Sequence, residues 1–157
     1  IQDPRGWWYM YESGGYPASC WKEIKNAWYY FNSDGYILTH WGKIDGRWYY
    51  FGADGSRKTG WQFVDGRWYY LEDNGIMATQ WKWINGKWYY LDASGAMTTG
   101  WQYIRNRWYY MDASGAMTTG WQYINGKWYC MDSNGVMYAN TWTPDGRYVD
   151  ASGALVR

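Results

Sequence analysis

Tryptophan and tyrosine are the side chains of this sequence with the clearest chemistry. The chain has 16 Trp and 19 Tyr among 157 residues and few aliphatic residues, so we expect aromatic rings rather than aliphatic chains to fill its interior. The face of an aromatic ring attracts cations through its quadrupole, and a box of such rings suits a quaternary ammonium group. Aromatic rings that are brought together without filling the interior could therefore bind an organic cation.

The aromatic residues recur with a fixed period. A first Trp stands every twenty residues and a second Trp follows it by seven, opening a Trp-Tyr-Tyr triplet that reads Trp-Tyr-Cys in the sixth copy. A glycine follows after seven more residues, and Met holds the slot two residues beyond it in the last four copies. A repeat of this length indicates a tandem array in which each copy is one small supersecondary structure.

Each repeat predicts a β-hairpin. An Asn-Gly pair at residues 125–126 separates two aromatic-rich runs, and it suits a type I′ turn because both central residues of that turn have positive φ. Such a turn pairs Tyr123 with Trp128 and Trp121 with Cys130. Side chains alternate along strands, so the two Trp residues of a repeat fall on one face. The Asp-x-x-Gly segment that follows predicts a second, looser turn.

An isolated hairpin is marginal in water, so these hairpins must stack on one another. We therefore expect an all-β fold, a solenoid of stacked β-hairpins built from aromatic repeats of about 20 residues. The expected organisation is a single repeat domain over residues 1–157, with a partial N-terminal repeat at 1–20, six full repeats at 21–140 and a degenerate C-terminal cap at 141–157. In the N-terminal part, Trp8 is interpreted as the triplet Trp of a preceding repeat.

The residue types that usually perform catalysis form no constellation here. His40 is the only histidine, and it replaces the glycine that precedes a repeat Trp. The Asp residues stand at turn positions, where Asp caps its own backbone. No zinc spacing, phosphate loop or nucleophile elbow is present. We expect that the chain is not an enzyme, that it needs no metal or cofactor, and that Cys20 and Cys130 stay unpaired.

Charge and hydropathy narrow the range of partners. A net charge of +1 offers no field to attract nucleic acid, and no run approaches the ~18 apolar residues of a membrane span. We therefore expect neither nucleic-acid binding nor membrane insertion. The chain opens at Ile1 without a leader, which we interpret as a mature or excised part of a longer protein.

The paired Trp residues predict a cage. The two lie diagonally across one hairpin, and the next hairpin can supply a third aromatic wall. One such site would be weak, near millimolar, after the costs of association. Several sites acting on one polymeric ligand would raise the avidity by about 10²–10⁴. The alternative is that the Trp pairs only form the core of the solenoid.

The repeat, for instance Gly120-Trp-Gln-Tyr-Ile-Asn-Gly-Lys-Trp-Tyr with Gly135-Val-Met137 after it, resembles the choline-binding repeat (cell-wall-binding repeat) family over nearly the whole chain. The resemblance implies a left-handed solenoid of hairpins and a ligand, choline or phosphocholine on teichoic acid, caged between consecutive hairpins. It also implies an extracellular protein attached to a Gram-positive cell wall.

Carried over from the family, each cage would combine the repeat Trp, the triplet Trp and a triplet Tyr of the following hairpin, with a Met nearby. The cages implied are Trp21, Trp28 and Tyr49; Trp41, Trp48 and Tyr69; Trp61, Trp68 and Tyr89; Trp81, Trp88 and Tyr109; and Trp101, Trp108 and Tyr129, with Met77, Met97 and Met117 in the Met slot.

Three departures from the repeat affect particular cages. Arg57 in the Met slot is expected to put a cation beside the cage of Trp41 and Trp48. Cys130 removes a ring from the sixth repeat. The last repeat lacks a Trp-Tyr-Tyr triplet, which argues against a cage at Trp121 and Trp128 of the sixth repeat.

Two other functions stay open at this point. Related aromatic repeats bind carbohydrate, either an α-glucan or a host glycan, but Gln62, Gln102 and Gln122 fall on the face opposite the Trp pair, which disfavours a sugar site. A ligand-free structural stalk is the second alternative, and association into a homodimer is also left open.

Overall fold

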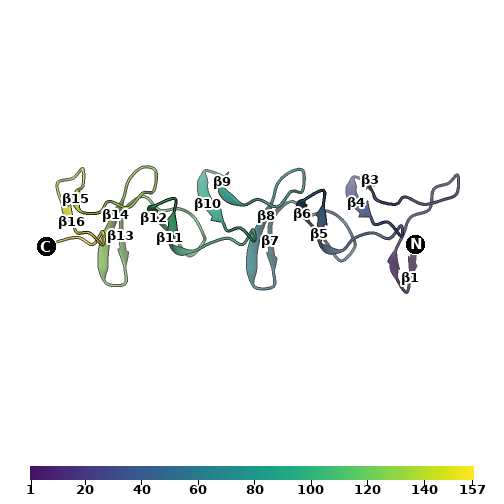
Figure 1. Ribbon diagram of the computed structural model, residues 1–157, viewed down its shortest axis with the longest axis horizontal. Coiled ribbons are helices and arrows are strands. Elements are labelled where there is room, and N and C mark those ends of the chain that lie inside the picture. The colour runs from purple at the N-terminus through teal and green to yellow at the C-terminus, as the bar shows by residue number, and fades with distance from the viewer. The chain divides into compact units, whose positions relative to one another are not determined.

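The computed structural model describes residues 1–157, and every regular element in it is a β-strand. The strands pair two by two in chain order, so that each sheet is one antiparallel hairpin (Figure 1). The chain has no helix long and apolar enough to cross a membrane. The predicted all-β fold of hairpins is confirmed.

The six central hairpins have strands of five residues, and the terminal hairpins have strands of two. The strands are β1 Gln2–Asp3, β2 Gly6–Trp7, β3 Cys20–Ile24, β4 Ala27–Phe31, β5 His40–Ile44, β6 Arg47–Phe51, β7 Gly60–Val64, β8 Arg67–Leu71, β9 Gln80–Ile84, β10 Lys87–Leu91, β11 Gly100–Ile104, β12 Arg107–Met111, β13 Gly120–Ile124, β14 Lys127–Met131, β15 Thr141–Trp142 and β16 Tyr148–Val149.

The chain divides into two compact units, Ile1–Ala78 and Thr79–Arg157. The first unit holds β1 to β8 and the second holds β9 to β16. The division of residues 1–157 into a partial repeat, six full repeats and a cap within a single domain stays a prediction.

Within each unit, backbone hydrogen bonds join each hairpin to a segment that lies further along the chain. In the first unit, the backbone N–H of Met77 donates to the carbonyl of Trp48 over 2.8 Å. In the second unit, Met117 donates in the same way to Trp88 over 2.8 Å. The segment after one hairpin therefore closes on the preceding hairpin, which is the stacking expected of a solenoid.

The tight turns have the predicted register. Tyr123 lies opposite Trp128, and Trp121 lies opposite Cys130. The turn residues 125 and 126 have φ angles of 50° and 83°, as a type I′ turn requires. The Asn-Gly pair therefore fixes which residues share a face.

The second turn of each repeat is held by an Asp side chain. The Oδ1 atom of Asp112 accepts hydrogen bonds from the backbone N–H of Ser114 at 2.9 Å and of Ala116 at 3.0 Å. The N–H of Gly115 donates to the Asp112 carbonyl over 2.9 Å, and this glycine has a φ of 86°. The recurring Asp residues thus act as turn caps, as the sequence predicts.

In each unit the core consists of the last residue of the second strand of the hairpins, with the exception of the N-terminal hairpin. The expectation that aromatic rings rather than aliphatic chains fill the interior is wrong here, because most of the fully buried positions carry aliphatic or Met side chains. Exposure below 2% is found at Phe31, Phe51, Leu71, Leu91, Met111, Met131 and Val149. No Trp belongs to this group, and many of the Trp rings keep solvent contact.

The N-terminal hairpin shows that the interpretation of Trp8 as a triplet Trp is wrong. The backbone N–H of Ile37 donates to the carbonyl of Trp7 over 2.8 Å, just as Arg57 donates to the triplet Trp28. Trp7, and not Trp8, therefore holds the position of a triplet Trp. A one-residue shift in this short hairpin accounts for the difference.

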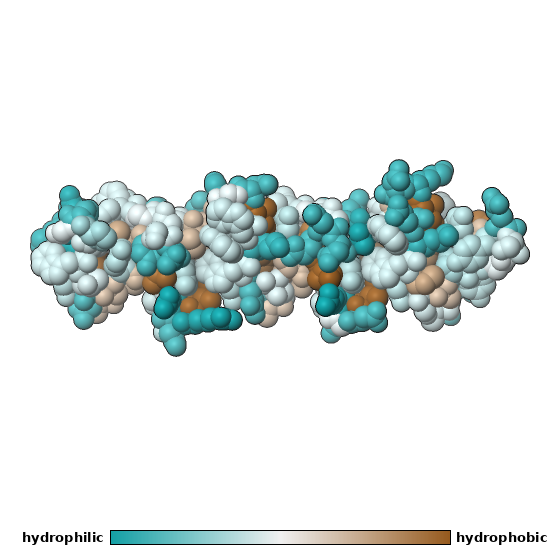
Figure 2. Space-filling view, turned by 90° about the horizontal axis from the view of Figure 1, so that it is seen from above, coloured by the Kyte–Doolittle hydropathy of each residue, from teal (hydrophilic) through white to brown (hydrophobic).

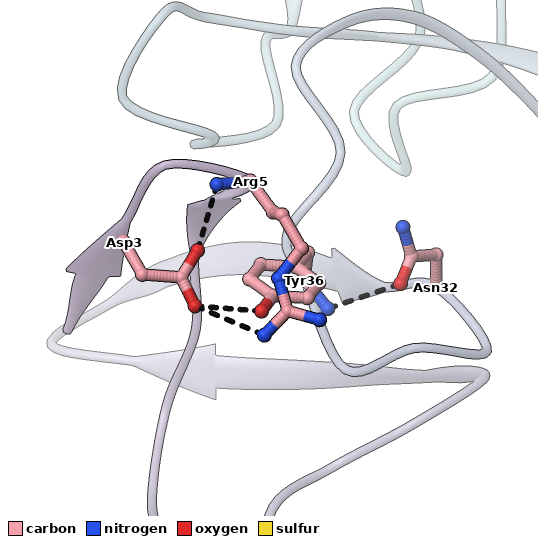
Figure 3. A network of polar contacts seen from close by, with 4 residues as sticks. All are labelled: Asp3, Arg5, Asn32 and Tyr36. Carbon is pink, nitrogen blue, oxygen red and sulfur yellow. Dashed lines mark hydrogen bonds and ion pairs between the residues drawn. The ribbon is translucent and has the colours of Figure 1, made fainter.

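The same hairpin is attached to the next repeat by a polar cluster. Figure 3 shows Asp3 facing Arg5 and the hydroxyl of Tyr36. That hydroxyl donates to the Asp3 carboxylate over 2.7 Å, and the hydrogen bond lowers the pKa of Asp3 and raises the pKa of Tyr36. The N–H of Tyr36 in turn donates to the side-chain oxygen of Asn32 over 3.0 Å. The cluster joins β1 to a turn of the following repeat.

Both cysteines are free, as predicted. His40 is exposed and has a φ of 63°, close to the 75° of the glycine at the equivalent position, Gly60. The histidine is the first residue of β5 and has a positive φ, which favours glycine at this position.

Candidate ligand-binding site

Three rings from two hairpins meet in the second unit. Trp81 on β9 and Trp88 on β10 have ring centroids 6.4 Å apart and planes at 89°. Tyr109 on β12, in the next hairpin, lies 4.8 Å from Trp81 with an interplanar angle of 65°. The rings form three walls, and we call this group, together with Met117, the Trp81 cage.

An open pocket lies at the Trp81 cage. Its volume is about 330 Å³, and its lining consists of the three rings, Met117, Ser133 and Asn134. No charged side chain lines it. A quaternary ammonium group has no N–H to satisfy, so a lining of ring faces and a thioether is chemically matched to it.

The same arrangement occurs in two other places within the units. In the first unit, Trp41 lies 6.4 Å from Trp48 and 4.8 Å from Tyr69. In the second unit, Trp101 lies 6.2 Å from Trp108 and 4.9 Å from Tyr129. The repeated spacing in the sequence therefore becomes repeated geometry.

The triplet Trp of each cage is open to solvent. Trp48, Trp88 and Trp108 are 41%, 40% and 41% exposed, which is far too much for core residues. Figure 2 shows one face of the molecule, on which small brown patches lie among pale and teal areas and no large hydrophobic area is seen. Paired rings that remain accessible favour a binding site over a purely structural role.

The two tyrosines of a triplet have different neighbours. Tyr90 lies across its own hairpin from Trp81, with centroids 5.2 Å apart. Tyr109 is the first tyrosine of the following triplet, and it is this residue that closes the cage from the next hairpin. The tyrosine that closes the cage is therefore the first one of the following triplet, which is the tyrosine that the family resemblance assigns to it.

The Met slot is also occupied as the spacing suggests, and Met137 belongs to it. Its backbone N–H donates to the carbonyl of Trp108 over 2.9 Å, so Met137 holds the same position relative to Trp108 as Met117 holds relative to Trp88. The sequence reasoning left this residue out of the site, although the glycine two residues before it carries the signal.

The first cage contains a different residue, and here the prediction for Arg57 is wrong. Its guanidinium carbon lies 5.6 Å from the ring centroid of Trp21 and 5.7 Å from that of Trp28. Arg57 therefore faces the first cage, which Tyr49 closes at 4.8 Å from Trp21, and not the cage of Trp41. The reason is that the residue in the Met slot bonds to an earlier hairpin. Arg57 follows β5–β6 directly, but its backbone N–H donates to Trp28 of β3–β4.

Trp61 and Trp68 form the same perpendicular pair, with centroids 6.4 Å apart. Tyr89 and Met97 belong to the second unit, whereas these two Trp residues belong to the first. The cage that the four would form stays a prediction.

The final repeat builds a different cavity. It has a volume of about 720 Å³ and is lined by Trp121, Trp128 and Trp142, among other residues. The Nε1–H of Trp121 donates to the Asp145 carboxylate over 3.0 Å. Hydrogen bonds from Thr143 and Trp121 lower the pKa of Asp145. Tyr148 also lines this cavity, although it belongs to no Trp-Tyr-Tyr triplet. The expectation that Trp121 and Trp128 form no choline cage stays a prediction.

The repeated glutamines are occupied with the backbone. The side-chain amides of Gln62, Gln102 and Gln122 donate to carbonyls three residues earlier, at 3.1, 2.9 and 3.0 Å. They therefore brace the linkers between hairpins. The chain contains no group of three or more His, Cys, Asp or Glu side chains that could hold a metal ion.

Stacked hairpins with recurring three-walled aromatic cages define a tandem-repeat binding module. The family model described as choline-binding repeat matches five overlapping stretches, residues 18–57, 38–80, 58–99, 78–119 and 98–142. The chain belongs to this choline-binding repeat family. No curated protein matches it closely enough to count as a relative.

Solved structures of choline-binding proteins are similar to the chain. Choline binding protein F from Streptococcus pneumoniae, in the presence of a peptidoglycan analogue, has a TM-score of 0.92 and 42% sequence identity over 100% of this chain and 57% of that one. CbpJ from Streptococcus pneumoniae has a TM-score of 0.92 and 38% identity over 99% of this chain and 57% of its own. This chain thus spans little more than half the length of either protein.

A more distant similarity is to the modular autolysin LytC from Streptococcus pneumoniae. The TM-score is 0.61 and the identity 27%, over 95% of this chain and 40% of LytC. This chain corresponds to repeats and not to a whole autolysin.

Proposed function

We propose that this chain is a non-catalytic module that binds choline, or phosphocholine on teichoic acid, and so attaches a longer protein to the outside of a Gram-positive cell wall. The observation that carries the proposal is the Trp81 cage, in which Trp81, Trp88 and Tyr109 surround an uncharged cavity beside Met117. Membership of the choline-binding repeat family supports the same ligand.

The physical argument rests on what a trimethylated ammonium requires. It is a cation with an apolar surface, so it gains from ring quadrupoles and from leaving water at the same time. Each ring contributes about 0.5–2 kcal/mol, and association costs leave one cage weak. Several cages on one polymer compensate through avidity, by about 10²–10⁴. A repeated weak site therefore suits a polymer that carries choline at intervals.

The first experiment is elution from a resin that bears tertiary or quaternary amines. We expect the chain to be retained and then released by free choline at tens to hundreds of millimolar. Soluble glucose polymers at matched mass concentration are the control, and they should release nothing. Release by the glucose polymers and not by choline would support a carbohydrate module instead.

The second experiment separates binding from a structural role. A ligand that binds only the folded state must raise the melting temperature, by an amount that grows with ligand concentration. We expect choline to raise it, and ethanolamine, which lacks the methyl groups, to raise it less. If choline changes neither the melting temperature nor the Trp fluorescence, the proposed choline site is refuted, and a stalk without a ligand is supported when glucose polymers also change neither.

A further inference from the structure

The first cage differs from the cages of Trp41, Trp81 and Trp101 in the residue that holds its Met slot. In the cages of Trp41, Trp81 and Trp101, the slot that follows the next hairpin carries Met, whereas in the cage of Trp21 it carries Arg57. The backbone is the same, because Arg57 donates its N–H to the carbonyl of the triplet Trp over 2.8 Å, as the Met residues do. At this slot, the cages therefore share the backbone hydrogen bond and differ in the side chain.

The stem of Arg57 takes over the packing of a methionine. A Cβ added at Gly75 would collide with the Cδ of Arg57, and a Cβ added at Gly135 would collide with the sulfur of Met117. Both side chains thus lie under the glycine of a later turn. Arg57 is longer than Met, so its guanidinium extends beyond the place where the thioether ends.

The guanidinium reaches the space between the two indoles. Its central carbon is 5.6 Å from the ring centroid of Trp21 and 5.7 Å from that of Trp28, so it is equally close to both. Both distances lie within the ~6 Å at which a cation interacts with a ring face. Burial against the rings lowers the pKa of Arg57, which agrees with partial desolvation of its head group.

We propose that Arg57 is an internal ligand of the first cage: its guanidinium occupies the position of the choline ammonium between Trp21 and Trp28, and it closes this cage to choline. The inference rests on the proposed function. If Arg57 fills the first cage, this cage joins β3–β4 to the segment after β6 without any ligand. The Met-bearing cages remain free for choline.

The test follows the indole N–H signals of the full chain, assigned by Trp→Phe variants, in ¹H–¹⁵N spectra during a choline titration. In the wild type we expect the signals of Trp81 and Trp88 to shift and those of Trp21 and Trp28 to stay. In Arg57→Met we expect all four to shift, with one more choline bound per chain by equilibrium dialysis.

A reciprocal variant provides the matched control. Met117→Arg places the same cation in the Trp81 cage, and we expect the signals of Trp81 and Trp88 to stop responding while those of Trp101 and Trp108 still respond. Arg57→Lys keeps a cation in the first cage and should leave it closed.

The outcomes separate the two proposals. If no indole responds in the wild type, the proposed function fails and this inference fails with it. If Trp81 responds and Trp21 responds at the same choline concentrations, the proposed function stands and the internal ligand is refuted. If Trp21 is silent in the wild type and also in a folded Arg57→Met variant, the arginine is not what closes the cage.

Discussion

The rings of Trp81 and Tyr109 lie 4.8 Å apart although they come from successive hairpins. Trp81 belongs to β9 and Tyr109 to β12, so their contact exists only when the two hairpins stack. The cage is thus a product of the stacking itself, and a hairpin cut out of the array would carry two walls of a site and not three. Binding and stacking are therefore expected to stabilise each other.

Replacing Trp81 by alanine removes one wall of one cage. We expect Trp81→Ala to bind one choline fewer per chain at saturation of the other cages, because a lost ring costs about 0.5–2 kcal/mol, or roughly 2- to 30-fold in affinity at that cage. Equilibrium dialysis measures the stoichiometry. The other cages should retain the variant on an amine resin, released at lower choline concentration.

The matched control is Trp83→Ala, which removes the same side chain from the same hairpin. Trp83 is 55% exposed, and its ring contacts Trp88 at 5.3 Å without lining the Trp81 cavity. This variant should keep the wild-type stoichiometry. An equal loss in both variants would assign the effect to damage of the hairpin.

A methyl group at Gly115 should destabilise the second unit. The φ of Gly115 is 86°, which costs an alanine about 1–2 kcal/mol, and the added Cβ would also collide with Met97. Gly126→Ala is the control, since Gly126 has a φ of 83° and open space around it. We expect Gly115→Ala to lose about 1–3 kcal/mol more than Gly126→Ala in urea unfolding. Equal losses would mean that Met97 moves aside without cost.

The Asp145 carboxylate should make the last hairpin sensitive to acid. Hydrogen bonds from Thr143 and Trp121 hold the pKa of Asp145 below its ordinary value of 3.8. The stabilisation is therefore complete above about pH 3.8 and disappears as the pH falls through the lower, folded-state pKa. Asp145→Asn should be less stable than the wild type at pH 6, and the difference in urea midpoint should vanish in stronger acid. A difference that persists unchanged to pH 2 would contradict this.

The two free cysteines should react at different rates. Cys130 is buried, and burial raises the pKa of its thiol, so little thiolate is available for attack. Cys20 is partly exposed. With an aromatic disulfide reagent at pH 8, we expect one thiol to react promptly and the second only in denaturant. The prompt phase should be absent in Cys20→Ser and present in Cys130→Ser.

The hairpins and their register could be predicted from the sequence because local chemistry determines them. An Asn-Gly pair favours a type I′ turn, and this turn places Tyr123 opposite Trp128. The pairing of the two Trp residues within one cage follows from the same alternation. These are relationships within one repeat, where spacing along the chain is sufficient.

Contacts between different repeats could be predicted less well from the sequence. The spacing places Arg57 in the Met slot, but only the hydrogen bond to the carbonyl of Trp28 shows which hairpin this slot closes on. Likewise, the abundance of Trp suggests a core of indoles, whereas the stack buries the residue after each triplet, such as Leu91 or Met111. Stacking geometry decides both points, and no local pattern encodes it.

Met117 reaches the Trp81 cage from beyond β12, so one cage draws on two consecutive hairpins and the turn that follows them. Copying twenty residues inside the array would reproduce all of these relationships and add one whole cage. Inserting a single residue between two hairpins would instead misplace the closing Tyr and Met at that junction alone. The array can therefore gain or lose whole repeats during evolution. Its avidity for a polymer then changes with the number of repeats, while each individual cage stays the same.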